Sequence, residues 1–174
     1  MIKCKRVLST AADDEKRKKL LEATLEGNNE PMMKIIDLIE HYSKIPCFRS
    51  DVEEMKNFYS SHAEKNGNAL FLLGLIHYQK SNAECVKFFS AAAEMNNAYG
   101  LAYLGFLNES GKYIAASLTE ATRLYTASVD KSNYLGQYFF GMMLQSTADG
   151  EKLLKLSAEQ NYIKAINQLK KIDN

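Results

Sequence analysis

Histidine and carboxylate side chains are the groups in this sequence that could carry out acid–base or metal chemistry. The three histidines are His41, His62 and His77, and none lies in an HExxH pattern or near cysteines at a zinc-binding spacing. His41 and His77 each precede a tyrosine near the end of a predicted helix. This placement is typical of a histidine packed between helices, so we predict no metal site and no cofactor.

The patterns that would indicate a nucleophile or a phosphate-binding loop are also missing. Cys4, Cys47 and Cys85 are widely spaced and form no CxxC pair, which argues against a disulfide framework. Cys85 is best interpreted as a small buried side chain. No GxSxG or GxGxxG occurs, and Gly111-Lys112 lacks the rest of a phosphate-binding loop. We therefore predict that the chain is not an enzyme.

Composition argues against nucleic-acid and membrane partners. The net charge of +1 provides no bulk attraction to nucleic acid. The basic run at residues 16–19 follows acidic residues 13–15, an order that suits an exposed helix face. No apolar run reaches the ~20 residues that span a bilayer, and no signal-peptide core is present. Together with the unpaired cysteines, this predicts the cytoplasm, or the host cytosol if the source is an intracellular pathogen or virus.

The elements that position these side chains are predicted to be helices built from a recurring motif. Only two prolines interrupt the chain and alternating β-branched residues are scarce, which indicates an all-α class. The motif is clearest in AAEMNNAYGLAYLG, which begins at Ala92. Related stretches begin at residues 23, 61, 128 and 157. Spacings of this size indicate a stacked array of helix pairs.

A capping pattern precedes four of these copies at a constant distance. It places a serine eleven residues before the motif, at Ser50, Ser81, Ser117 and Ser146, with an acidic residue three positions further on. This capping box predicts that each serine begins a second helix of fixed length. Left-handed turns are predicted between the helices at Asn28, Asn66-Gly67, Asn96-Asn97, Ser132-Asn133 and Asn161.

The repeated motif, with its alanines, its leucine-glycine end and the following loop, resembles the Sel-like repeat family, a short relative of the tetratricopeptide repeat. The resemblance implies a right-handed α-solenoid of antiparallel helix pairs, with about ten helices. The length of 174 residues predicts one domain over residues 1–174. Within it, the resemblance implies divergent helices at 1–60, clear repeats at 61–169 and a capping helix at 162–174. The family's role is scaffolding through protein–protein contacts, in adaptors and in virulence-associated proteins.

The repeat grid predicts a partner-binding row on the first helix of each pair. Positions spaced i, i+4 and i+7 lie farthest from the small residues that face neighbouring helices. The predicted binding residues are Leu72, Leu75, Tyr99, Tyr103, Phe106, Leu135, Phe139 and Met142. The corresponding row in the last copy is polar, with Lys164, Gln168 and Lys171. An apolar groove with a basic end would suit an amphipathic helix or an extended peptide.

Three other interpretations of this row stay open. Tight curvature of the solenoid would bury it within the monomer, or the row would form the seam of a homodimer. A catalytic site of unrecognised type in the groove is the third. Exposure of the side chains in the monomer separates the first interpretation from the others.

Overall fold

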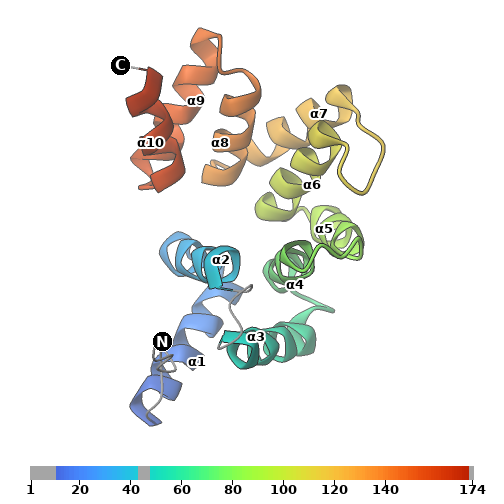
Figure 1. Ribbon diagram of the computed structural model, residues 1–174, viewed down its shortest axis with the longest axis vertical. Coiled ribbons are helices and arrows are strands. Elements are labelled where there is room, and N and C mark those ends of the chain that lie inside the picture. The colour runs from blue at the N-terminus through green and yellow to red at the C-terminus, as the bar shows by residue number, and fades with distance from the viewer. Residues whose placement is uncertain (1–10, 43–47, 173–174) are drawn as a thin grey trace, which may run out of the picture. The chain divides into compact units, whose positions relative to one another are not determined.

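The described part of the chain is entirely helical. The computed structural model describes residues 11–42 and 48–172, and these residues form ten α-helices (Figure 1). They are α1 (Ala11–Leu25), α2 (Asn29–Tyr42), α3 (Arg49–His62), α4 (Gly67–Gln79), α5 (Cys85–Glu94), α6 (Ala98–Ser110), α7 (Leu118–Val129), α8 (Tyr134–Met143), α9 (Ala148–Glu159) and α10 (Ile163–Ile172). The predicted all-α class is confirmed. Cys4, Cys47 and the last two residues of the predicted capping helix lie outside the described residues.

The helices form two compact units, whose boundary falls between Phe88 and Phe89, inside α5. We call them the N-terminal unit and the C-terminal unit. The sequence favoured one domain over residues 1–174, with divergent helices up to residue 60. That organisation stays a prediction.

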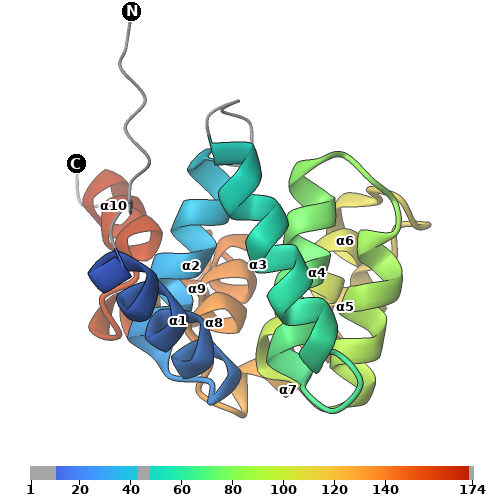
Figure 2. The ribbon, with the colours of Figure 1, turned by 90° about the horizontal axis from the view of Figure 1, so that it is seen from below.

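In the N-terminal unit, α3 packs on α4, α1 packs on α2, and α4 also contacts α1 and α2. Figure 2 shows α3 and α4 side by side. The buried hydroxyls of Thr24 and Tyr59 lie 3.0 Å apart and connect α1 to α3. Asn66 donates from its side-chain amide to the carbonyl of Leu25, and its Oδ1 accepts from the backbone of Asn68 and Ala69. One asparagine therefore begins α4 and satisfies the end of α1.

In the C-terminal unit, consecutive helices pack on one another from α6 to α10, and α6 also contacts α8. Glycines allow the closest approaches. A Cβ atom at Gly105 would lie 2.7 Å from the Tyr125 ring, and one at Gly141 would lie 2.9 Å from Leu154. These glycines occupy the same position in two motif copies, and their small size allows neighbouring helices to approach closely.

The motif copies begin their first helices in one common register. In every copy, the carbonyl five residues after the motif start accepts from the amide four residues further on. The accepting residues are Asn28, Asn66, Asn97, Asn133 and Tyr162. The divergent N-terminal copy therefore shares the helix start of the clearer ones.

The predicted left-handed turns are confirmed in three of the five places. Asn96, Ser132 and Asn161 have positive φ angles of 57°, 54° and 66°. In the first copy Gly27 takes this role instead of Asn28, with a φ of +82°. Asn66 is extended, with a φ of −135°, because it is the N-cap of α4.

One of the four predicted capping serines acts as expected. Ser117 accepts at 3.2 Å from the amide of Glu120 and begins α7. The prediction for Ser146 is wrong by one residue, because the Thr147 hydroxyl accepts from Gly150 and begins α9. The prediction for Ser50 is also wrong, because α3 has already begun at Arg49.

Ser81 fails as a cap for a different reason. It lies in the left-handed conformation, with a φ of 54°, and ends α4. Its amide donates to the carbonyl of Tyr78, and the amide of Asn82 donates to that of His77. This is the paired hydrogen bonding of a Schellman ending. Asn82 then accepts from the amide of Glu84 before α5 begins.

Candidate functional site

The structure separates the predicted binding residues by burial. Leu72, Leu75, Tyr99, Tyr103 and Leu135 are buried, and none is more than 4% exposed. The sequence left open whether these side chains are exposed. The structure shows that these five are buried within the chain. Phe106, Phe139 and Met142 are half-buried. We call these three residues the α6–α8 face. Contact with a partner through this face stays a prediction.

Tyr103 is buried because aromatic rings surround it. Its ring centroid lies 5.1 Å from that of Phe89, 6.3 Å from Phe106 and 5.3 Å from Phe139. The rings of Phe106 and Phe139 stack on each other at 5.3 Å. Aromatic pairs at these separations attract beyond their buried area. The α6–α8 face therefore rests on a buried tyrosine that fixes the orientation of its two rings.

Further rings lead from this face to the last helix. Phe139 lies 5.6 Å from Tyr138, and Tyr138 lies 5.2 Å from Tyr162, just before α10. The ammonium group of Lys164 lies 6.0 Å from the Tyr162 ring centroid, at the outer limit of a cation–π contact. Aromatic contacts thus connect α6, α8 and the beginning of α10.

The α6–α7 pair also buries a polar contact beside these rings. The hydroxyl of Tyr125 donates to the Glu109 carboxylate at 2.6 Å. Burial raises the pKa of Tyr125, and the neighbouring carboxylate of Glu109 raises it further. Tyr125 therefore acts as a neutral hydrogen-bond donor that holds the end of α6 to α7.

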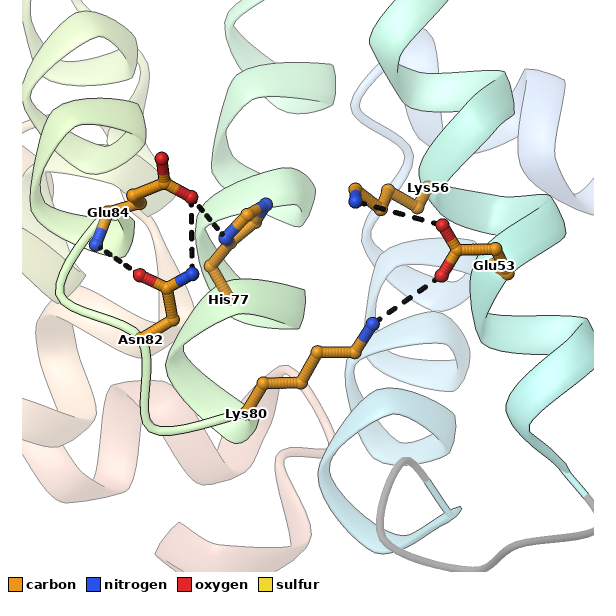
Figure 3. A network of polar contacts seen from close by, with 6 residues as sticks. All are labelled: Glu53, Lys56, His77, Lys80, Asn82 and Glu84. Carbon is orange, nitrogen blue, oxygen red and sulfur yellow. Dashed lines mark hydrogen bonds and ion pairs between the residues drawn. The ribbon is translucent and has the colours of Figure 1, made fainter.

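A separate polar network lies in the N-terminal unit (Figure 3). His77 Nδ1 lies 3.3 Å from the Glu84 carboxylate, which also accepts from the side-chain amide of Asn82 at 3.1 Å. These contacts of Glu84 hold together the turn between α4 and α5. On the other side of His77, Glu53 pairs with Lys56 at 3.7 Å and Lys80 at 3.5 Å (Figure 3).

His77 occupies an environment that disfavours its charged form. Its side chain is only 12% exposed, and its ring packs against that of Phe88 with the centroids 5.0 Å apart. Burial lowers the pKa of His77, the Glu84 carboxylate opposes this by raising it, and Lys56 and Lys80 lower it further. One histidine and one carboxylate form a polar contact rather than a metal site. Among the described residues, no group of three or more His, Cys, Asp or Glu side chains is placed to hold a metal ion.

The sequence pointed to His77 as a packed histidine but not to its partners. In the sequence, Glu84 is the acidic residue of the capping pattern that begins at Ser81. The two residues meet because the left-handed turn at Ser81 reverses the chain. A spacing of seven residues across a turn carries no helical periodicity, so no sequence signal identifies the pair.

The described helices include no candidate membrane-spanning segment. None of the helices within residues 11–42 and 48–172 combines the length and apolar composition needed to cross a bilayer.

No protein-family profile and no curated protein matches the sequence of this chain. In structure, the chain is similar to a Sel1 repeat protein from Oxalobacter formigenes, with a TM-score of 0.54 and 20% sequence identity. The similarity covers 79% of this chain and 60% of that protein, so the chain spans about three fifths of the relative's length. The Sel1-like repeat fold predicted from the motif is therefore confirmed. At this identity the likeness shows the fold alone.

Proposed function

We propose that this Sel1-like chain is a protein-interaction module that binds a partner through the α6–α8 face. Stacked helix pairs form extended surfaces that repeat proteins use for binding. The observation that carries the proposal is the group of half-buried apolar side chains Phe106, Phe139 and Met142 on two neighbouring first helices. Adjacent apolar side chains that keep access to solvent are typical of interaction sites.

The packing beneath this face also suits binding. Phe106 and Phe139 stack on each other and both contact the buried ring of Tyr103. Side chains already held in place lose little conformational entropy when a partner docks. Aromatic residues in such positions commonly contribute most of the affinity at protein interfaces.

We place this interaction in the cytoplasm, or in the host cytosol for a pathogen protein. The cysteine pattern supports this assignment, because the three cysteines are odd in number and widely spaced. Cys85 is fully buried in α5, where it acts as a packing side chain.

Affinity purification of the tagged full chain tests the proposal. The variant Phe106→Gln/Met142→Gln removes two of the three apolar side chains of the face and leaves Phe139 and Tyr103 in the sequence. Leu118→Gln is the matched control, because Leu118 is 63% exposed at the start of α7 and lies outside the face. The wild type and the control should retain the same partner proteins, and the face variant should lose them while keeping its helical circular dichroism.

Light scattering on the purified chain distinguishes a partner from a second copy. A concentration-dependent dimer that only the face variant abolishes would assign the face to self-association and overturn the proposal. An unchanged set of partners in the face variant would also overturn it.

A further inference from the structure

Charge is unevenly distributed over the first helices of the C-terminal unit. α8 (Tyr134–Met143) contains no Lys, Arg, Asp, Glu or His, and α6 contains a single charged residue, Glu109. That carboxylate accepts a hydrogen bond from the hydroxyl of Tyr125. In contrast, α10 (Ile163–Ile172) contains Lys164, Lys170 and Lys171 and no acidic residue. The surface formed by these helices therefore changes from apolar to basic along the chain.

The basic helix is connected to the α6–α8 face by direct contacts. The ring of Phe139 touches Tyr138, Tyr138 touches Tyr162, and the Lys164 ammonium group lies over the Tyr162 ring. The first lysine of α10 is thus three side-chain contacts from the centre of the face.

The repeat register places a second lysine on the same line. Phe106, Met142 and Lys171 each lie fourteen residues after the start of their motif copies, at 92, 128 and 157. The first two are half-buried, and Lys171 is exposed. Equivalent positions of successive repeats face the same side of a stacked array. The line that is apolar at α6 and α8 is therefore cationic at α10.

We infer that the partner is an amphipathic helix of another protein whose apolar stripe covers the α6–α8 face and whose acidic end lies against α10. This rests on the proposed function of the face. Apolar side chains of the partner would bury against Phe106, Phe139 and Met142, and its carboxylates would pair with Lys164 and Lys171. Complementary charge at the edge of an interface fixes the direction in which a helix docks.

The same distribution disfavours a nucleic acid as the ligand. Nucleic acids require cations along the whole path of the phosphate backbone. Here the lysines lie at one end only, and the rest of the path is uncharged apart from Glu109.

A displayed library of random 16-residue peptides provides the probe. The immobilised full chain serves as bait, and a parallel selection uses Phe106→Gln/Met142→Gln. Peptides enriched on the wild type over the face variant should carry apolar residues at helical spacing and an excess of Asp and Glu toward one end. For the selected peptides, replacing those acids by Gln should weaken binding about three- to tenfold, since exposed charge pairs each contribute modestly. The loss should shrink at high salt.

The charge-reversal variant Lys164→Glu/Lys171→Glu gives the decisive comparison. It should still select peptides with the same apolar spacing, but with a basic end. If the wild type selects apolar peptides whose end charge is random or basic, the inference fails and the proposed function stands. If the wild type enriches nothing over the face variant, the proposed function itself fails. Enrichment of nucleic acid from an equal pool of random single strands, lost in the reversal variant, would overturn the choice of partner.

Discussion

At the residue scale, small side chains set how closely neighbouring helices approach. Gly100 in α6 lies against α5, and a Cβ atom added there would be 2.5 Å from the Cβ of Ala92 and 3.0 Å from the backbone nitrogen of Ala93. Both partners belong to the C-terminal unit. Contacts this short require one helix to shift, so the glycine is needed for packing rather than for backbone freedom.

Gly100→Ala should therefore destabilise the protein, although alanine is the better helix former. Overpacking typically costs 1–3 kcal/mol, whereas the helix-propensity gain is at most about 1 kcal/mol. Urea unfolding measures the difference. In an Ala92→Gly background, the cost of Gly100→Ala should be smaller, because the nearest clashing atom has been removed. An equal cost in both backgrounds would show that this contact does not limit the helix approach.

His77 makes stability depend on pH. Its pKa lies below the ordinary 6.5, with burial as the main cause, so the unfolded chain binds the proton more readily than the folded one. The contribution of His77 to the free energy of unfolding should therefore be complete above about pH 6.5. It should be lost as the pH drops through the folded pKa. His77→Gln should remove this part of the pH dependence in urea titrations at pH 7.5 and 5.5.

A further variant makes this prediction specific. Glu84→Gln removes the charge that raises the pKa of His77, so an NMR titration should place the His77 midpoint lower still. A higher midpoint in Glu84→Gln would contradict the assigned role of the carboxylate.

At the scale of the element, the first helices α4, α6 and α8 begin at asparagine caps. Asn97 accepts at 2.9 Å from the amide of Gly100, and Asn133 accepts at 3.1 Å from the amides of Leu135 and Gly136. Asn97→Ala should lower the unfolding free energy by about 1 kcal/mol, the usual cost of a lost N-cap. Asn133→Ala should cost more, because Asn133 is only 5% exposed and its loss leaves two buried amides unsatisfied.

Thermal unfolding followed by circular dichroism measures both effects. Asn167→Ala is the control, since Asn167 is exposed within α10 and alanine suits a helix interior. It should be neutral or slightly stabilising. If Asn97→Ala behaved like this control, the cap would contribute nothing measurable to the start of α6.

The start of a helix could be predicted from sequence where it lies at a fixed position of the repeated motif. It could not be predicted from the Ser-x-x-Glu side-chain pattern alone. The common register at Asn66, Asn97 and Asn133 follows from repeat spacing. The pattern Ser-x-x-Glu identifies side chains capable of capping, but a neighbouring residue can take the cap, as Thr147 does. At Ser81 the end of the preceding helix determines the backbone conformation, and local sequence carries little information about that competition.

The candidate site shows a similar limit. Helical periodicity placed Tyr103, Phe106 and Phe139 in the predicted row, and their rings are in contact. It could not give their depth, because burial depends on rings from other elements, such as Phe89 above Tyr103. Periodicity gives the side of a helix on which a residue lies. Tertiary packing decides whether that side reaches solvent.

At the scale of the whole molecule, repeat packing is clearest in the C-terminal unit, where consecutive helices pack on one another from α6 to α10. Such arrays gain stability mainly from contacts between adjacent repeats. In the C-terminal unit, side-chain hydrogen bonds also connect α7 to α6 and α9 to α8. Ser128 in α7 donates to the carbonyl of Ala98, and Ser157 in α9 donates to that of Tyr134. These two serines are the first residues of their motif copies, so one hydrogen bond recurs between successive repeats.

A fragment of residues 81–174, which retains α5 to α10, should therefore fold by itself. It keeps the rings that surround Tyr103, both recurring serine bonds and three helix pairs, about the minimum for a stable array. Helical circular dichroism and cooperative urea unfolding would show folding. The shorter fragment 118–174 loses Tyr99, Tyr103 and the Glu109 partner of Tyr125, and it should be largely unfolded. If fragment 81–174 were also unfolded, residues 1–174 would behave as the single cooperative domain that the sequence predicts. If it folds, the C-terminal unit is stable without the helices of the N-terminal unit.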